Sequence, residues 1–166
     1  MYRHISDFLA DWQTETASTS KVLEALTDAS LAQPITAEGR TLGQLAWHVV
    51  QTLTEMPHNA GLLDSNELDS QPVPTAAVAF SETYAHLAQQ VAATVEERWT
   101  DNQLGDEVPM YGRTMTKRFI LSLLIRHEIH HRGQMTVLMR QAGLRVPGVY
   151  GPTREDWAEW GMPVPA

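Results

Sequence analysis

Apolar residues recur every three or four positions in four long segments of the chain, which is the spacing of one face of an α-helix. These segments run from about Ile5 to Ala29, from Thr41 to about Pro57 or Leu63, from about Thr75 to Trp99, and from Thr114 or Thr116 to Gly143. A shorter segment from Thr153 to Trp160 predicts a fifth helix. Glycines and prolines fall mainly between the segments, and we find no strand-like alternation longer than a few residues. The pattern predicts an all-α fold, a four-helix bundle with a short extra C-terminal helix, as a single domain over residues 1–166.

The composition limits the partners and the metal ligands that we expect for this chain. The chain has 166 residues, no cysteine and a net charge of -8. The acidic surface repels phosphate backbones, so we expect no nucleic-acid partner. No segment has the length and apolarity of a membrane span, and the first residues are too polar for a secretion signal, so we expect a cytoplasmic protein. Without thiolates, any metal has to be held by imidazole and carboxylate groups.

Two of the seven histidines, His127 and His131, are four residues apart in the fourth predicted helix. Their rings leave the same face from Cβ atoms about 6 Å apart, and two imidazoles so placed can reach one ion at about 2.1 Å each. Chance alone gives about 0.3 such pairs in this chain, so the spacing is a weak signal by itself. Its location strengthens it, because both rings fall on a stripe that we expect to face the core. That stripe comprises Ile120, Leu124, His127, His131, Gln134 and Leu138. From the residues alone, a shared metal and two core histidines satisfied by other polar groups both stay open.

The same segment matches the H-E-x-x-H pattern of zincin proteases, with Glu128 in the place of the general base. The longer metzincin pattern requires Gly and His where this chain has Gln134 and Val137. Zincins also carry a sheet, for which the chain has little strand signal. We therefore expect no protease.

A third ligand has to come from another segment. His48 lies beside the apolar stripe of the second predicted helix and is the best candidate. His130 is the alternative, although it points about 100° away from its neighbour His131. His4, His58 and His86 lie in polar or terminal surroundings, where we expect them to be solvated.

Two motifs together resemble the DinB family of metal-binding four-helix-bundle proteins. They are Thr41-Leu-Gly-Gln-Leu-Ala-Trp-His48 and, about eighty residues later, His127-Glu-Ile-His-His131-Arg-Gly-Gln134. The resemblance implies a bundle of up-down-down-up order with a long crossover connection. It also implies a metal site formed by His48, His127 and His131, in agreement with the choice made from the residues.

The resemblance implies an enzyme more weakly than it implies a site, because family members differ in activity. We expect one divalent ion, zinc or nickel, and a small-molecule substrate. The preferred activity is a thiol-dependent S-transferase, in which a low-molecular-weight thiol attacks a small electrophile. The alternatives are a metal-dependent hydrolase and a non-catalytic metal-binding stress protein. Gln134 is a candidate to support a ligand ring, although a polar contact with a neighbouring helix is the simpler expectation. A homodimer stays open.

Overall fold

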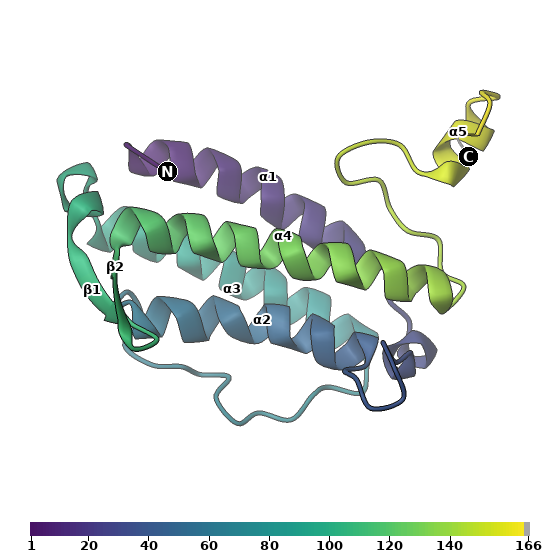
Figure 1. Ribbon diagram of the computed structural model, residues 1–166, viewed down its shortest axis with the longest axis horizontal. Coiled ribbons are helices and arrows are strands. Elements are labelled where there is room, and N and C mark those ends of the chain that lie inside the picture. The colour runs from purple at the N-terminus through teal and green to yellow at the C-terminus, as the bar shows by residue number, and fades with distance from the viewer. Residues whose placement is uncertain (165–166) are drawn as a thin grey trace.

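The computed structural model describes residues 1–164 and confirms a mainly helical chain (Figure 1). The four long helices are α1 (Ile5–Glu24), α2 (Leu42–Asn59), α3 (Ala77–Arg98) and α4 (Lys117–Gln141). Shorter elements lie between and after them: the 3₁₀ helices η1 (Asp28–Ala32) and η2 (Asp101–Gly105), the strands β1 (Glu107–Met110) and β2 (Arg113–Thr116), and α5 (Arg154–Glu159). The last two residues of the predicted 1–166 domain lie outside the described part of the chain.

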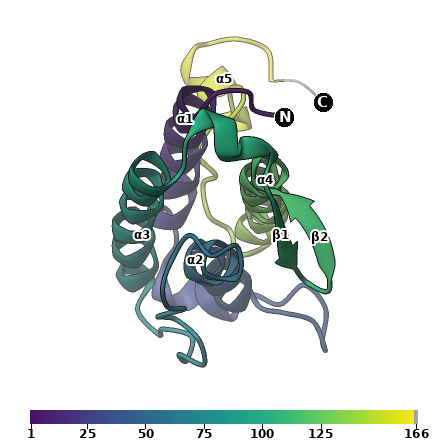
Figure 2. The same cartoon turned by 90° about the vertical axis from the view of Figure 1, so that its left-hand side faces the viewer.

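The long helices form a bundle of up-down-down-up order. Helices α1 and α4 run in one direction and α2 and α3 in the other, and the segment 60–76 crosses back along the bundle to join α2 to α3 (Figure 1). Seen end on, α2 lies between α3 and α4, and α1 closes the ring (Figure 2). Helices α2 and α4, which carry the candidate ligands, are therefore direct neighbours.

The core is built from apolar side chains of all four long helices. Phe8 and Trp12 of α1, Phe80 of α3 and Met135 of α4 are all at most 2% exposed. The Trp12 indole nitrogen donates a hydrogen bond to the Ala88 carbonyl at 3.0 Å, so this buried aromatic side chain satisfies its polar atom. Burial of these faces in the shared core holds the helices together.

Several helix ends differ from the predictions. Helix α1 ends at Glu24 rather than near Ala29, and the chain turns into η1. Helix α2 passes through Pro57 and ends at Asn59, so it does not continue to Leu63. Thr41 and Gln44 do form a capping box at the start of α2. Gly143 follows α4 with φ +76°, the left-handed conformation expected of a helix-terminating glycine.

A two-stranded hairpin precedes α4 and was not predicted. Strands β1 and β2 pair antiparallel, and Tyr111 and Gly112 form the turn with φ of +51° and +70°. Two positive φ angles are typical of the tight type I′ turn. The hairpin leads directly into α4, whose N-cap is Thr116, one of the two predicted caps, although its side chain makes no capping hydrogen bond.

The predicted inward stripe of α4 is rotated relative to the observed one. Ile120, Leu124 and Leu138 are buried, but His127 and His131 are only partly buried and Gln134 is exposed. The central buried positions are instead Glu128 and Arg132, each 2% exposed. The prediction failed here because it assigned the core positions to histidines, whereas hydrogen bonds with other elements offset the burial of Glu128 and Arg132.

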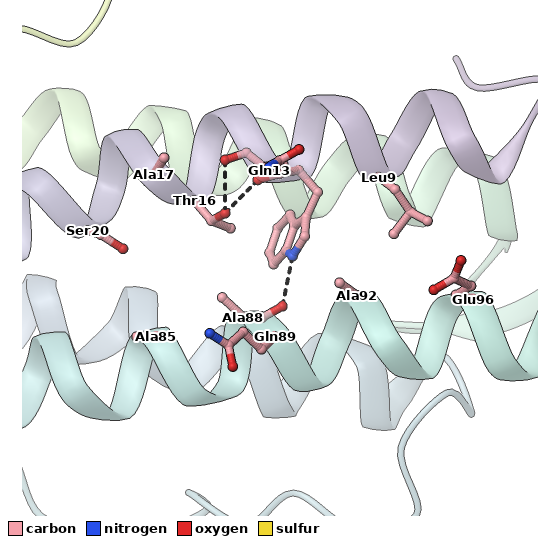
Figure 3. Close-up of a pocket in the computed structure, with 11 residues that line it drawn as sticks. Leu9, Gln13, Thr16, Ala17, Ser20, Ala85, Ala88, Gln89, Ala92 and Glu96 are labelled. Carbon is pink, nitrogen blue, oxygen red and sulfur yellow. Dashed lines mark hydrogen bonds between the residues drawn. The ribbon is translucent and has the colours of Figure 1, made fainter.

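A groove of about 460 Å³ lies between α1 and α3 (Figure 3). Its lining includes the small side chains of Ala17, Ala85, Ala88 and Ala92. The groove lies on the side of the bundle opposite the α2–α4 contact. Within the described residues, no helix is both long and apolar enough to cross a membrane.

Candidate metal centre

Three histidine side chains converge where α2 packs against α4. His48 comes from α2, and His127 and His131 come from adjacent turns of α4. Nε2 of His127 lies 3.2 Å from Nε2 of His48 and 3.1 Å from Nε2 of His131. One ring nitrogen from each residue lies within 4.8 Å of the other two, which makes the three a candidate metal-binding group. The structure thus brings together the three residues that the sequence singled out.

The arrangement of ring nitrogens fits a cation better than hydrogen bonds among the rings. A neutral imidazole carries one N–H, and Nε2 of His127 cannot direct one proton at two neighbours at once. With an ion about 2.1 Å from each nitrogen, these two separations would correspond to N–ion–N angles of about 95° and about 99°, between the octahedral and tetrahedral values. The donor set therefore fits a divalent metal.

Burial keeps the rings in the neutral form that a metal requires. It is the main cause that lowers the pKa of His48 and of His127 to about 4. The pKa of His131 is also lowered by burial, against a hydrogen bond from its ring to Gln134 that raises it. Neighbouring histidines and the Arg40 charge lower these pKa values further. All three rings are therefore neutral at physiological pH and present lone pairs.

Gln134 contacts His131 rather than a neighbouring helix. Its Oε1 lies 2.7 Å from Nδ1 of His131. Because an amide oxygen only accepts, the proton of that ring sits on Nδ1 and the lone pair is on Nε2, which faces the other two histidines. This contact fixes both the tautomer and the orientation of the ring.

The remaining histidines lie outside this group. His130 is exposed; its ring centroid is 4.9 Å from that of His131, but it contributes no nitrogen to the cluster. His4 pairs with Asp101 at 2.9 Å on the surface, and Nδ1 of His58 contacts the Leu63 carbonyl. His86 is also exposed.

Glu128 does not occupy the position of a zincin general base. Its side chain turns into the core, where Oε1 accepts a hydrogen bond from the Tyr84 hydroxyl of α3. Burial raises the pKa of this carboxyl. The carboxyl group is thus part of the packing between α3 and α4.

Arg132, one turn beyond Glu128, joins three parts of the chain. Its guanidinium donates to the Glu15 carbonyl and to Thr19 Oγ1 of α1, both at 2.9 Å. It also donates to the Glu15 carboxylate and to the Tyr150 hydroxyl of the C-terminal segment. These contacts explain how a charged side chain is fully buried directly behind the histidines.

A polar recess of about 450 Å³ opens beside His48. Its lining comprises Glu38, Gly39, Arg40, Gln44, His48 and Gln51. Sequence reasoning missed Arg40, because it lies in a loop and outside every motif; its only signal is that it directly precedes the capping residue of α2. Of the three clustered histidines, His48 lines the recess.

Comparison with known proteins decides the family. Residues 1–162 match the sequence profile of the DinB family. The chain belongs to the DinB family. It is 41% identical to YrdA of Bacillus subtilis over 165 residues, which cover 99% of each chain.

Solved structures of DinB-like proteins have the same architecture. A DinB-like protein from Bacillus cereus is 44% identical and superposes with a TM-score of 0.86 over 90% of this chain and all of its own. YfiT of Bacillus subtilis is 17% identical, with a TM-score of 0.64 over 85% of this DinB chain and 89% of its own. YfiT is described as "a probable metal-dependent hydrolase with an unusual four-helix bundle topology". The likeness to YfiT concerns the fold alone.

Proposed function

We propose that this DinB protein is an enzyme that depends on one divalent metal ion held by His48, His127 and His131. The observation that carries the proposal is the convergence of three neutral Nε2 atoms, with two separations of 3.1 and 3.2 Å, next to an open polar recess. Three neutral ligands would leave the charge of the ion uncompensated and a coordination position free, which is typical of catalytic sites; the ion would supply Lewis acidity there. Zinc and nickel both suit imidazole ligands.

The residues of the chain have separate tasks in this proposal. The three histidines hold the ion between α2 and α4, and Gln134 keeps His131 in the tautomer that presents Nε2. Arg132 and Glu128 fasten α4 to α1 and α3 from the core side, so the pair of ligands on α4 stays in place. The recess beside His48 admits the small molecule.

The reaction that we favour is transfer of a low-molecular-weight thiol to a small electrophile. A carbon–sulfur bond forms, the bond from carbon to the leaving group breaks, and the thiol proton passes to solvent. The chain has no cysteine, so the sulfur has to come from a cosubstrate. Support for transfer over other reactions comes from the resemblance to DinB proteins.

Hydrolysis is the second candidate. The description of YfiT, which has the same fold, favours it. In this case water takes the place of the thiol, and the same three histidines are needed. The presence or absence of an added thiol therefore separates the two reactions.

The test uses zinc- or nickel-loaded protein with 1-chloro-2,4-dinitrobenzene and with a nitrophenyl ester, each with and without a thiol. We expect release of chloride only when thiol is added, and a loss of at least about 100-fold in turnover after chelation or in His127→Ala. His130→Ala is the matched control and should retain turnover. Ester cleavage without thiol would favour the hydrolase, and turnover that survives chelation would contradict the proposal.

A further inference from the structure

The recess beside His48 contains an arginine that makes no ion pair within the described residues. Arg40 lines it together with His48, and its guanidinium pairs with no carboxylate among residues 1–164. Arginines elsewhere in the molecule do form ion pairs, and their partners are Asp64, Glu15, Glu155, Asp156 and Glu159.

The backbone around Arg40 is fixed even though its side chain is exposed. The Arg40 carbonyl accepts a hydrogen bond from the Ile35 amide at 3.0 Å. The next residue, Thr41, caps α2, and the Leu42 amide donates to the Gln33 carbonyl at 2.8 Å. A β-carbon at Gly43 would lie 3.1 Å from the carbonyl oxygen of Leu31, so this glycine allows η1 to pack closely against the start of α2. The backbone from which the Arg40 side chain lines the recess is therefore held in place.

Gln44 adds a second donor to the same recess. Its Oε1 accepts from the Thr41 amide at 2.8 Å in the capping box, which fixes the side chain. The amide NH₂ has no hydrogen-bond partner within the described part of the chain and is free to donate. In Gln51, the amide nitrogen is already bonded to the Leu68 carbonyl at 3.2 Å.

The charges around the site favour an anionic guest. Three neutral imidazoles contribute no negative charge, so a divalent ion and Arg40 would together make the recess strongly positive. Glu38 also lines the recess and offsets part of this charge. The Arg40 guanidinium and the Gln44 amide NH₂, whose residues line the same recess, are both donors of the kind that a carboxylate or phosphate accepts.

We propose that Arg40 and the amide of Gln44 bind a carboxylate or phosphate group on the molecule that reaches the three histidines. The inference rests on the proposed function and adds the substrate class to it. Arg40 is then a specificity residue: it selects molecules that carry an anionic group beside the atom that approaches the ion.

The experiment measures binding of matched probes to the cobalt-loaded full chain through the visible absorption of cobalt. One pair is 3-mercaptopropionate against 2-mercaptoethanol, and the other is succinate against butyrate; 3-phosphonopropionate tests phosphate against carboxylate. We expect the wild type to bind the probe with the extra anionic group at least about fivefold more tightly. A preference for 3-mercaptopropionate over 2-mercaptoethanol would indicate that the thiol carries the anionic group. A preference for succinate over butyrate would indicate that the electrophile carries it.

Variants of the recess residues test whether the preference for anionic probes arises in the recess. Arg40→Met should abolish it and Arg40→Lys should retain part of it, since lysine keeps the charge but not the fork of donors. Gln44→Glu preserves the capping box and should weaken anionic probes. Arg113→Met removes an exposed arginine of the hairpin and should leave the preference unchanged. Glu38→Gln should strengthen binding of the anionic probes.

Equal binding of the two members of each pair by wild type, or a preference that persists in Arg40→Met, would overturn the inference while leaving the metal site intact. Absence of a cobalt spectrum would instead remove the proposed function, and the inference with it.

Discussion

The contact between Gln134 and His131 is the best test of how single side chains prepare the cluster. Gln134 is exposed, yet its Oε1 lies 2.7 Å from Nδ1 of His131. Replacing Gln134 by Leu removes the acceptor and lets the ring rotate or change tautomer. We expect zinc affinity to fall by about 10-fold or more, measured by competition with a chromogenic chelator. Gln141→Leu, an exposed glutamine two turns further along α4, is the matched control; equal losses in both variants would contradict the role of Gln134.

The buried histidines also make stability depend on pH. In the folded protein His48 and His127 have a pKa of about 4, whereas an unfolded histidine titrates near 6.5. As pH falls below about 6.5, the unfolded chain takes up protons first, so the free energy of unfolding decreases down to about pH 4; above 6.5 these rings cause no change.

Because the rings are only half-buried, solvent screens their charges, and we expect the free energy of unfolding to fall by about 1 kcal/mol per ring. Urea unfolding of metal-free protein at pH 7.5 and at pH 5 measures it. The variant His48→Gln/His127→Gln should show a smaller loss; the same loss in the variant would show that other groups cause the pH dependence.

At the scale of elements, α4 is the helix on which both the core and the candidate site depend. Arg132 makes its hydrogen bonds to α1 and to the C-terminal segment while only 2% exposed. The Glu15 carboxylate is nearly buried, and Arg132→Met would remove its ion-pair partner. We expect a destabilisation of about 3–5 kcal/mol by urea unfolding. Arg140→Met, which breaks an exposed pair with Glu155, should cost less than about 1 kcal/mol; similar values for both would contradict this account.

The same helix illustrates what the sequence could reveal. Apolar periodicity was sufficient to predict four long helices, and the i, i+4 spacing of His127 and His131 was sufficient to place their rings on one face. Periodicity could not determine which side of α4 faces the core, because burial of Glu128 and Arg132 depends on Tyr84, Glu15 and Thr19 from distant segments. The hairpin escaped prediction because its strands are four residues long, one contains Pro109, and the turn is Tyr-Gly rather than Asn-Gly.

At the scale of the whole molecule, the candidate site links segments that are far apart in sequence. His48 and His127 are separated by 79 positions and meet only because the crossover returns the chain and sets α2 beside α4. The family resemblance anticipated this meeting, and spacing alone could not. The position of Arg40 beside His48 could not be predicted from the sequence, because it follows from the packing of η1 against α2.

The metal content of purified protein, measured beside three variants, tests whether the three histidines bind an ion. Wild-type protein equilibrated with zinc or nickel and freed of excess ion should hold one ion per chain. His48→Ala and His127→Ala should lose most of it, and His130→Ala should bind as the wild type does. Full metal content in His48→Ala together with loss in His130→Ala, or no bound ion in wild type under any loading condition, would contradict the three-histidine centre.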